Sequence, residues 1–247
     1  MTPLDAEQVK PYDSQRPKAE QVELMFDSIA PAYDFMNRAM TLGIDKWWRA
    51  KAVRMLRKEH PCRILDIATG TGDLAIKLAR SIDGCTVDGV DLSQGMIDIG
   101  RRKVQDAGLS ERITMNVGDC LDLKIPDNSY DAITVAYGVR NFEHLLAGYK
   151  EMARVLKSGG MLCVIELSTP RGRLVRPLYN LYTRVIIPTI GRIVSKDTRA
   201  YSYLPESIEA VPQGQTMIEL MRRAGLIRCH YQPMTFGVCT IYTAYKP

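Results

Sequence analysis

From residue 63 onward, short runs of apolar residues alternate with segments in which apolar residues recur at helical spacing. Short apolar runs bounded by turn residues are typical of buried strands, and apolar residues at i, i+3 and i+4 indicate helices. We expect strands at 63–67, 85–91, 112–117, 131–136 and 160–166, and helices at 73–82, 94–107 and 143–157. Gly159-Gly160 should form the turn before the strand at 160–166. This rhythm predicts right-handed crossovers and a mostly parallel α/β sheet with helices on both faces.

The last part of the chain predicts a hairpin that follows one more helix. Residues 213–224 have helical spacing and precede Gly225, a residue suited to the end of a helix. Two strand-like runs, at 227–235 and 239–245, are separated by Phe236-Gly237, which predicts a tight turn. The final two strands should therefore be antiparallel to each other.

The first part of the chain lacks this alternation. Residues 1–19 are polar and contain proline, so we expect a flexible N-terminal arm. Residues 20–58 show helical periodicity that is punctuated by Pro31 and Gly43. We expect a single domain at 20–247, in which the helices of residues 20–58 cover the sheet.

Composition excludes several classes of protein. With 46% hydrophobic and 25% charged residues, the chain can bury a core and is not expected to be disordered. No apolar run approaches the ~20 residues of a membrane-spanning helix, and the polar start is unlike a signal peptide. The six cysteines form no CxxC pair and the three histidines are scattered, so we expect no metal site. Buried free thiols indicate a reducing cytoplasm.

The positive charge of the chain is concentrated in one segment. Residues 171–200 contain seven Arg or Lys and one Asp, a net charge of +6, whereas the remainder carries −1 of the total of +5. Within 173–187, apolar residues at helical spacing predict an amphipathic helix with a wide apolar face. This face either packs on the domain or meets an apolar ligand or membrane. We interpret 171–205 as an insertion that binds the substrate and contacts the membrane surface.

A small-residue loop follows the first predicted strand. The sequence from Asp66 to Gly72 is GxGxG-like, with glycines at Gly70 and Gly72 and Ala68 where a first glycine often stands. Small residues between a strand and a helix let the backbone approach a ligand, and an acid at the end of the next strand, Asp91, can bind ribose hydroxyls. The loop therefore predicts a nucleoside site.

The charges around this loop distinguish between two nucleoside ligands. A nicotinamide dinucleotide needs a pyrophosphate at the start of the helix, where Asp73 would repel it. Asp66 and Asp73 instead suit S-adenosylmethionine, which carries a sulfonium and an ammonium group. Asp119, after the third strand, can accept a hydrogen bond from the adenine amine, and the backbone N–H of Cys120 can donate to a ring nitrogen. The carboxyl ends of parallel strands meet at one edge of the sheet, so we expect these groups to lie together.

Six segments resemble known methyltransferases, and the resemblance runs from about residue 20 to the C-terminus. Four of them resemble the class I methyltransferases in general, and two are specific to the C-methyltransferases of quinone biosynthesis. The four general segments are LDIATGTGDL, GVDLSQGM, PDNSYDAITVAYGVRNF and RVLKSGGMLCVIELSTP, and the two specific ones are FDSIAPAYDFMNRAMTLGIDKWWR (26–49) and DTRAYSYLPESI (197–208).

This resemblance implies a Rossmann-like, seven-stranded sheet with an antiparallel last strand. It also implies transfer of a methyl group from S-adenosylmethionine to a ring carbon of demethylmenaquinol or of a ubiquinol precursor, without a metal. Cofactor contacts carry over to Thr71, Asp91, Asp119 and Cys120. A serine that some members have is Ala136 here, which removes one polar contact.

The segment Tyr137–Asn141 follows the fourth predicted strand and should face the transferred methyl. It lacks the Asn/Asp-Pro-Pro-aromatic motif of enzymes that methylate nucleic-acid amines, so no nucleic-acid partner is expected. A quinol carbon becomes nucleophilic when a ring hydroxyl loses or shares its proton. We therefore expect Arg140 to stabilise that oxygen and Asn141 to orient it, unless Arg140 only forms a structural salt bridge.

Other candidates for the acceptor side are Tyr33, Asp34, Asp197 and Tyr201. We expect a cytoplasmic enzyme that contacts the inner face of the membrane. A methyltransferase for a soluble phenol remains an alternative, as do, with less support, a nicotinamide oxidoreductase, a nucleic-acid methyltransferase and a non-catalytic binding module. The sequence does not distinguish menaquinol from ubiquinol precursors, and it leaves the general base and the oligomeric state open.

Overall fold

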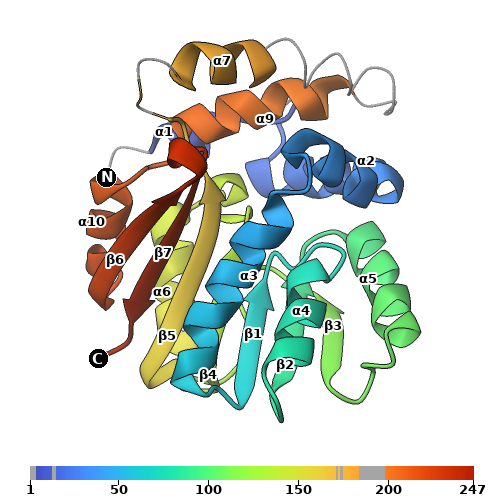
Figure 1. The fold of residues 1–247 in the computed structure, drawn as a ribbon, viewed down its shortest axis with the longest axis vertical. Coiled ribbons are helices and arrows are strands. Elements are labelled where there is room, and N and C mark those ends of the chain that lie inside the picture. The colour runs from blue at the N-terminus through green and yellow to red at the C-terminus, as the bar shows by residue number, and fades with distance from the viewer. Residues whose placement is uncertain (1–3, 13–14, 171, 173–174, 184–197) are drawn as a thin grey trace.

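The computed structural model describes residues 4–12, 15–170, 172, 175–183 and 198–247, apart from the side chains of Thr198 and Tyr201. A seven-stranded sheet with the order β3-β2-β1-β4-β5-β7-β6 runs through the centre (Figure 1). The strands are β1 (Arg63–Ile67), β2 (Thr86–Asp91), β3 (Ile113–Val117), β4 (Tyr130–Ala136), β5 (Leu156–Leu167), β6 (Ile227–Met234) and β7 (Cys239–Tyr245). β1 to β5 are parallel, and β7 is antiparallel to both β5 and β6. The predicted sheet, including its antiparallel end, is confirmed.

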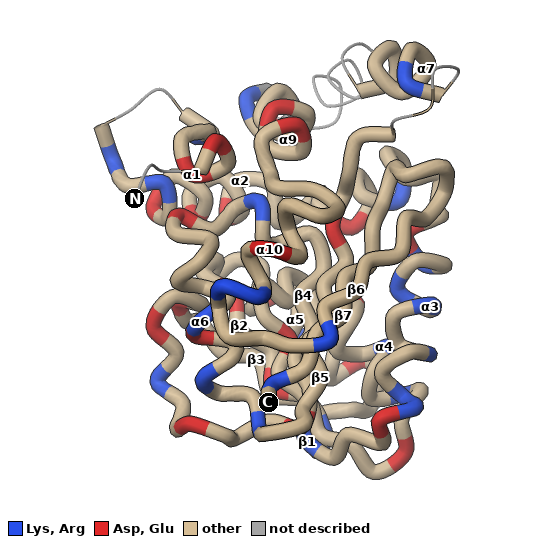
Figure 2. Tube along the Cα trace, turned by 90° about the vertical axis from the view of Figure 1, so that its left-hand side faces the viewer, with Lys and Arg blue, Asp and Glu red and all other residues tan. Residues whose placement is uncertain are grey.

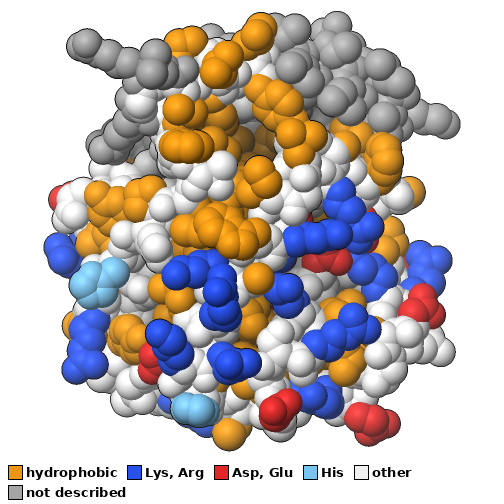
Figure 3. Space-filling view, in the orientation of Figure 1, with side chains coloured by type: hydrophobic (Ala, Val, Ile, Leu, Met, Phe, Trp, Pro, Cys, Tyr) orange, Lys and Arg blue, Asp and Glu red, His pale blue; other side chains and the backbone are white. Residues whose placement is uncertain are grey.

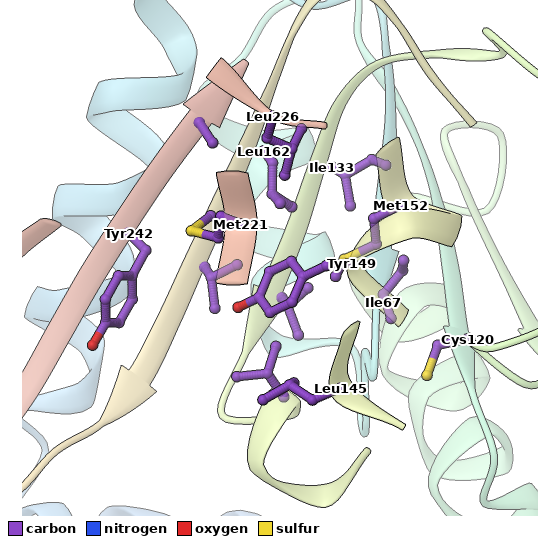
Figure 4. Close-up of a cluster of buried hydrophobic side chains, with 14 of the residues drawn as sticks. Ile67, Cys120, Ile133, Leu145, Tyr149, Met152, Leu162, Met221, Leu226 and Tyr242 are labelled. Carbon is purple, nitrogen blue, oxygen red and sulfur yellow. The ribbon is translucent and has the colours of Figure 1, made fainter. Parts of the chain in front are cut away.

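Helices cover both faces of the sheet because its central strands are apolar on both sides. Ile64 of β1 packs with α3 (Asp45–Leu56), α4 (Asp73–Ser81) and α5 (Gln94–Asp106). Leu65 and Ile67 of the same strand point to the other face, which is covered by α6 (Leu145–Val155) and α10 (Gln215–Arg223). Figure 4 shows this second core, where Tyr149 and Met152 of α6 lie beside Met221 of α10.

The predicted turn at Gly159-Gly160 is wrong, because β5 begins earlier and passes through it. Leu156 pairs with Tyr130, but the next pair is Met161 with Ala132, so the strand contains an irregularity at the glycines. Gly159 has φ +76°, a conformation that glycine adopts without strain and that lets the strand bend while pairing resumes.

The helical cover is one long helix followed by α3. The helix α2 (Lys18–Thr41) continues through Pro31 and ends at Leu42, which is in the left-handed conformation. Pro31 does not divide the helix as the sequence suggested. The reason is that Met25 and Ile29 before the proline and Met36 after it are buried in the same apolar cluster, which holds both halves of the helix in line.

Part of the predicted N-terminal arm is packed against the domain. The short helix α1 (Asp5–Gln8) buries Ala6, and the backbone N–H of Leu145 donates to the carboxylate of Glu7 at 2.9 Å. Flexibility of residues 1–19 remains a prediction.

Two helices of the predicted insertion lie above the carboxyl ends of the parallel strands, as Figures 1 and 2 show. They are α7 (Val175–Leu181), which falls within the predicted amphipathic helix, and α9 (Thr198–Ala210). Short 3-10 turns occur at η1 (Arg57–Glu59), η2 (Val139–Asn141) and η4 (Thr235–Gly237), the last forming the β6–β7 turn. In the part of the chain that the structure describes, no helix is long and apolar enough to span a membrane.

Candidate functional site

The loop after β1 is a tight turn built on left-handed residues. Ala68, Gly70 and Gly72 have φ values of +51°, +56° and +79°, and Gly72 is the residue before α4. A glycine is common at the first position because an L side chain is strained there, so Ala68 carries a cost that the surrounding packing offsets. A Cβ on Gly70 would meet only Tyr33, at 3.8 Å, which leaves the backbone at Gly70 accessible to a ligand.

Asp66 lies behind this loop and lines neither of the two cavities described below. Its carboxylate accepts hydrogen bonds from the hydroxyls of Thr69 (2.6 Å) and Thr134 (2.5 Å). Burial raises the pKa of Asp66 to about 6, and the two hydroxyls act in the opposite direction. Asp66 thus ties the loop to β4.

A small cavity of about 60 Å³ lies at the carboxyl ends of β1, β2 and β3. Its walls include Gly70, Asp91, Asp119 and Cys120, four residues that the sequence predicted for a nucleoside site. Other walls come from α2, from the end of β4 and the segment after it, and from the segment between β2 and α5. They include Ala19, Val22, Glu23, Phe26, Ala136, Gly138, Leu92 and Ser93.

Asp91 is the best-defined polar group of the small cavity. Its carboxylate accepts from the backbone N–H groups of Gly70 (2.8 Å) and Ser93 (3.0 Å). Burial raises the pKa of Asp91, the two N–H groups lower it, and the nearby Asp27 raises it further. No described cation forms an ion pair with Asp91, so its carboxylate retains capacity to accept from hydroxyl donors.

Asp119 and Cys120 contribute differently to the same wall. The Asp119 carboxylate accepts from the backbone N–H of Leu121 at 2.8 Å. The Cys120 side chain is buried, and burial raises the pKa of its thiol. A neutral thiol is a weak hydrogen-bonding group, so the backbone of Cys120 is the better ligand-binding element.

Thr71, Asp34 and Asp73 form a charged cluster beside the loop and line neither cavity. The ammonium of Lys103 lies 2.6 Å from Asp34 and 2.5 Å from Asp73, and the hydroxyl of Thr71 donates to Asp34 at 2.6 Å. Burial acts to raise the pKa of Asp73, but Lys103 and Arg49 hold it below its ordinary value. The structure therefore separates Asp34 from the acceptor side, for which the sequence suggested it.

A large cavity of about 430 Å³ adjoins the small one, and its lining is mostly apolar. The lining includes Met25, Ile29, Met36 and Met40 of α2, Trp48 of α3, Leu178 of α7, Tyr203 and Leu204 of α9, and Val238 after the β6–β7 turn. Phe26, Tyr33, Tyr137 and Asn141 line both cavities. A reaction between ligands in the two cavities would therefore take place beside these four residues.

Arg140 reaches the large cavity from η2 and is buried. Its guanidinium lies 2.8 Å from a carboxylate oxygen of Glu166 on β5 and also donates to the carbonyl of Tyr137. Burial acts to lower the pKa of Arg140, but Glu166 and the neighbouring tyrosines raise it above its ordinary value, so the group stays charged. The Nε atom is buried without a hydrogen-bond partner among the described residues. Arg140 therefore forms a structural salt bridge and lines the cavity as well.

Two residues of the site, Glu166 and Tyr203, escaped the sequence analysis. Glu166 could have been noticed, because it is a single acid in a long apolar strand. Tyr137 begins the segment that the sequence placed opposite the transferred methyl. It has φ +61°, and its hydroxyl is buried without a partner among the described residues. The hydroxyl of Tyr203 donates to Oδ1 of Asn141 at 3.1 Å, and Tyr203 lies within the segment 197–208 that was singled out as a motif. Asp197 and the side chain of Tyr201, which were proposed instead, lie outside the described residues.

The described residues contain no group of three or more His, Cys, Asp or Glu that could hold a metal ion. All six cysteines are free, and Cys62 is the exposed one among them.

Comparison with solved structures assigns the fold to a class. The chain superimposes on the [4+2]-cyclase SpnF with a TM-score of 0.69 over 93% of this chain and 96% of that one, at 18% identity. It also matches a phosphoethanolamine N-methyltransferase 2 from Haemonchus contortus in complex with S-adenosyl-L-methionine, with a TM-score of 0.57, 17% identity, and 75% and 48% coverage. The fold is that of the class I methyltransferases.

Sequence comparison identifies the family within this class. The chain belongs to the ubiE/COQ5 methyltransferase family, whose sequence profile matches residues 14–246. It is 48% identical to a demethylmenaquinone methyltransferase of Bacteroides fragilis over 240 residues, which are 97% of this chain and 98% of the relative. The enzyme of that name from Porphyromonas gingivalis is 46% identical over 97% and 98% of the two chains. The ubiquinone/menaquinone biosynthesis C-methyltransferase UbiE of Geobacter sulfurreducens is 41% identical over 93% and 90%.

Proposed function

We propose that this protein transfers a methyl group from S-adenosylmethionine to a ring carbon of a prenylated quinol, converting demethylmenaquinol to menaquinol. The observation that carries this proposal is the meeting of a small polar cavity and a large apolar cavity at Phe26, Tyr33, Tyr137 and Asn141. Near-full-length identity of 46–48% to proteins named demethylmenaquinone methyltransferase supports the choice of acceptor.

The small cavity fits S-adenosylmethionine chemically. Asp91, a partly buried carboxylate that pairs with no cation of the described residues, would accept from the ribose hydroxyls, and Asp119 would accept from the adenine amine. The donor carries its methyl group on a positively charged sulfur. Among the described residues, no cation pairs with Asp91, so none repels this charge from the Asp91 carboxylate. The cavity has a volume of only about 60 Å³, so we expect its walls, which include Ala19, Val22 and Phe26 of α2, to move outward when the donor binds.

The acceptor ring would occupy the part of the large cavity next to Arg140 and Asn141. When a ring hydroxyl shares or loses its proton, a ring carbon attacks the methyl. The sulfur–methyl bond breaks, S-adenosylhomocysteine is the leaving group, and the carbon then loses its own proton to restore the aromatic ring. Arg140 stabilises the negative oxygen and keeps its own proton, because its pKa is raised. A bound water or a carboxylate accepts the proton, since arginine does not act as the base.

The apolar walls of the large cavity would hold the start of the prenyl chain. Three exposed large apolar residues line this cavity, namely Leu42 and Ile44 between α2 and α3 and Leu178 of α7. Three more, Trp47 of α3, Leu181 of α7 and Phe236 of the β6–β7 turn, are exposed and adjoin the lining residues Trp48, Tyr182 and Thr235 in the sequence. Figure 3 shows apolar side chains gathered in the upper part of this face and Lys and Arg below them, over the region of α3 and α4. This arrangement suits a cytoplasmic protein that inserts an apolar rim into the inner membrane face and keeps its charges at the lipid head groups.

A ubiquinol precursor is the second candidate acceptor, because the Geobacter sulfurreducens relative carries a name that covers both quinones. Incubation with methyl-labelled S-adenosylmethionine and each reduced precursor, followed by mass analysis of the lipid, distinguishes the two. We expect label on the ring of menaquinol. Label in a soluble phenol, with no retention of prenylated quinol by the protein, would contradict the proposal.

Donor binding is tested separately by calorimetry with S-adenosylmethionine and S-adenosylhomocysteine. We expect heat of binding from the wild-type protein and at least about tenfold weaker binding by Asp91→Ala. No heat with either compound would overturn the assignment of the small cavity.

A further inference from the structure

The contact between Tyr203 and Asn141 connects α9 to the place where the two cavities meet. The Tyr203 hydroxyl donates to Oδ1 of Asn141 at 3.1 Å, and both residues line the large cavity. Asn141 also lines the small cavity. Its Nδ2 group makes no hydrogen bond to the part of the chain that the structure describes, so its two N–H donors are available to a ligand.

A side-chain amide has two different edges, and rotating it by half a turn exchanges them. The nitrogen edge donates hydrogen bonds and the oxygen edge accepts them. An acceptor oxygen that becomes negative needs donors, and a carbonyl oxygen facing it would repel it. Asn141 can therefore stabilise a negative acceptor oxygen only if the nitrogen edge of its amide faces the large cavity.

Tyr203 is itself held firmly. Its side chain is 3% exposed and packs in the apolar cluster that contains Met25, Ile29 and Met36 of α2. Burial raises the pKa of Tyr203, while the charge of Arg140 acts in the opposite direction. The hydroxyl therefore remains protonated at neutral pH and can donate to Asn141.

We propose that Tyr203 is a positioning residue that fixes the Asn141 amide with its N–H edge toward the ring oxygen of the acceptor. The inference rests on the proposed quinol chemistry and deepens it, because it gives the 197–208 motif a role in that chemistry. Arg140 and Asn141 then form a pair of donors, the first held by Glu166 and the second by Tyr203. Two separate elements, β5 and α9, must be in place for both donors to face the same oxygen.

Tyr203→Phe keeps the ring and removes only the hydroxyl. We expect kcat to fall about tenfold, which is less than the ~10²–10³-fold loss of kcat seen when an oxyanion donor is removed altogether. The KM for S-adenosylmethionine should stay within about twofold of the wild-type value. Tyr149→Phe is the matched control, because its buried hydroxyl contacts Met217 at 3.2 Å in the core and lines neither cavity. It should leave kcat unchanged.

A double-mutant cycle tests whether Tyr203 acts through Asn141. Tyr203→Phe should lower kcat little further in an Asn141→Ala background, because the amide that it orients is already absent. Additive losses, or a kcat for Tyr203→Phe close to that of the wild type, would overturn the inference. A lower melting temperature with unchanged kcat would show a purely structural role and would also overturn it.

A binding measurement keeps this test separate from the identity of the acceptor. In the presence of S-adenosylhomocysteine, 4-nitrophenol is titrated with the wild-type protein, and its phenol and phenolate forms are distinguished by absorbance. We expect the bound probe to ionise about tenfold more readily in the wild type than in Tyr203→Phe, a difference of about one pKa unit. Equal ionisation would overturn the inference even if the wild type methylates demethylmenaquinol. A difference would support it even if that methylation fails.

Discussion

Ala68 and Gly138 meet at the carboxyl ends of β1 and β4, so closely that a Cβ on Gly138 would lie 2.5 Å from the Cβ of Ala68. A Cβ there would also lie 3.0 Å from Cγ1 of Val135. The alanine in the loop after β1 is therefore compatible only with a glycine in the segment after β4.

Gly138→Ala should destabilise the protein by about 1–3 kcal/mol, the usual cost of overpacking, as measured by urea unfolding. Adding Ala68→Gly should restore most of the loss, because it removes the opposing Cβ and because φ +51° suits glycine. A double variant as unstable as Gly138→Ala would show that the contact with Ala68 is not the cause.

Arg140 is predicted to serve both stability and turnover, and the two roles can be measured apart. Arg140→Ala leaves the buried carboxylate of Glu166 without its cation, which should cost about 3–5 kcal/mol of unfolding free energy. The turnover number should fall by about 10²–10³ under conditions where the variant is folded. Arg63→Ala is the control, because its pair with Asp88 is half exposed and should contribute at most about 1 kcal/mol.

Replacing both partners of the buried pair isolates catalysis from folding. Arg140→Met with Glu166→Leu should recover much of the stability, since apolar side chains of similar volume can replace a buried ion pair. Turnover should stay low. A turnover number near that of the wild type in Arg140→Ala or in the double variant would remove Arg140 from catalysis.

Lys18 should make stability depend on pH. Its ammonium is buried at the start of α2, and it donates to the carbonyls of Ala6 at 2.5 Å and Arg140 at 3.0 Å. Burial, and then the charge of Arg140, lowers the pKa of Lys18 from 10.5 to about 8. Between these values the unfolded chain binds a proton that the folded protein has released, so the unfolding free energy rises with pH in that window.

The measurement compares wild type with Lys18→Met from pH 7 to 10. The difference in unfolding free energy, wild type minus variant, should be constant below pH 8 and grow by up to about 1.4 kcal/mol per pH unit above it. The exposed Lys58 provides the control, since Lys58→Met should show no such growth. A flat difference would mean that Lys18 keeps its proton in the folded protein.

The apolar rim should decide membrane binding. Trp47→Ser combined with Phe236→Ser should weaken sedimentation with anionic vesicles by at least about tenfold, because the two rings would otherwise be buried in the lipid. Ile227→Ser should have no effect, because Ile227 is also exposed but lies at the opposite end of β6 from the turn. Added salt should weaken binding of the wild type. Equal binding to neutral and anionic vesicles would argue against a role for the basic residues.

The sequence predicted the sheet well because buried strands and amphipathic helices have different apolar periods. It failed where tertiary packing outweighed a local signal. Pro31 lies inside α2 because buried residues on both sides hold the helix, and Gly159-Gly160 lies inside β5 because pairing resumes after the irregularity. Both outcomes depend on contacts with distant parts of the chain, which the local sequence around Pro31 and Gly159 does not show.

The sequence predicted correctly only those site residues whose position is determined by the path of the backbone. Asp91 and Asp119 follow strands, so the topology brings both to the small cavity. Thr71 and Asp34 depend on the direction of side chains, and Lys103 of α5 draws both into a cluster that lines neither cavity. Tyr203 approaches Asn141 from 62 residues away in the sequence, a relationship that only the folded chain reveals.

The helix α2 is a shared wall, since its residues from Ala19 to Tyr33 border the small cavity and those from Met25 to Thr41 border the large one. At about 1.5 Å per residue, its 24 residues span both without a break. If the proposed nucleoside displaces the part of α2 beside the small cavity, the part beside the large cavity should shift with it, and that part would contact the proposed quinol. Each ligand should change the equilibrium affinity for the other by the same factor, so the order in which the two enter and leave is expected to be set by this single rigid element.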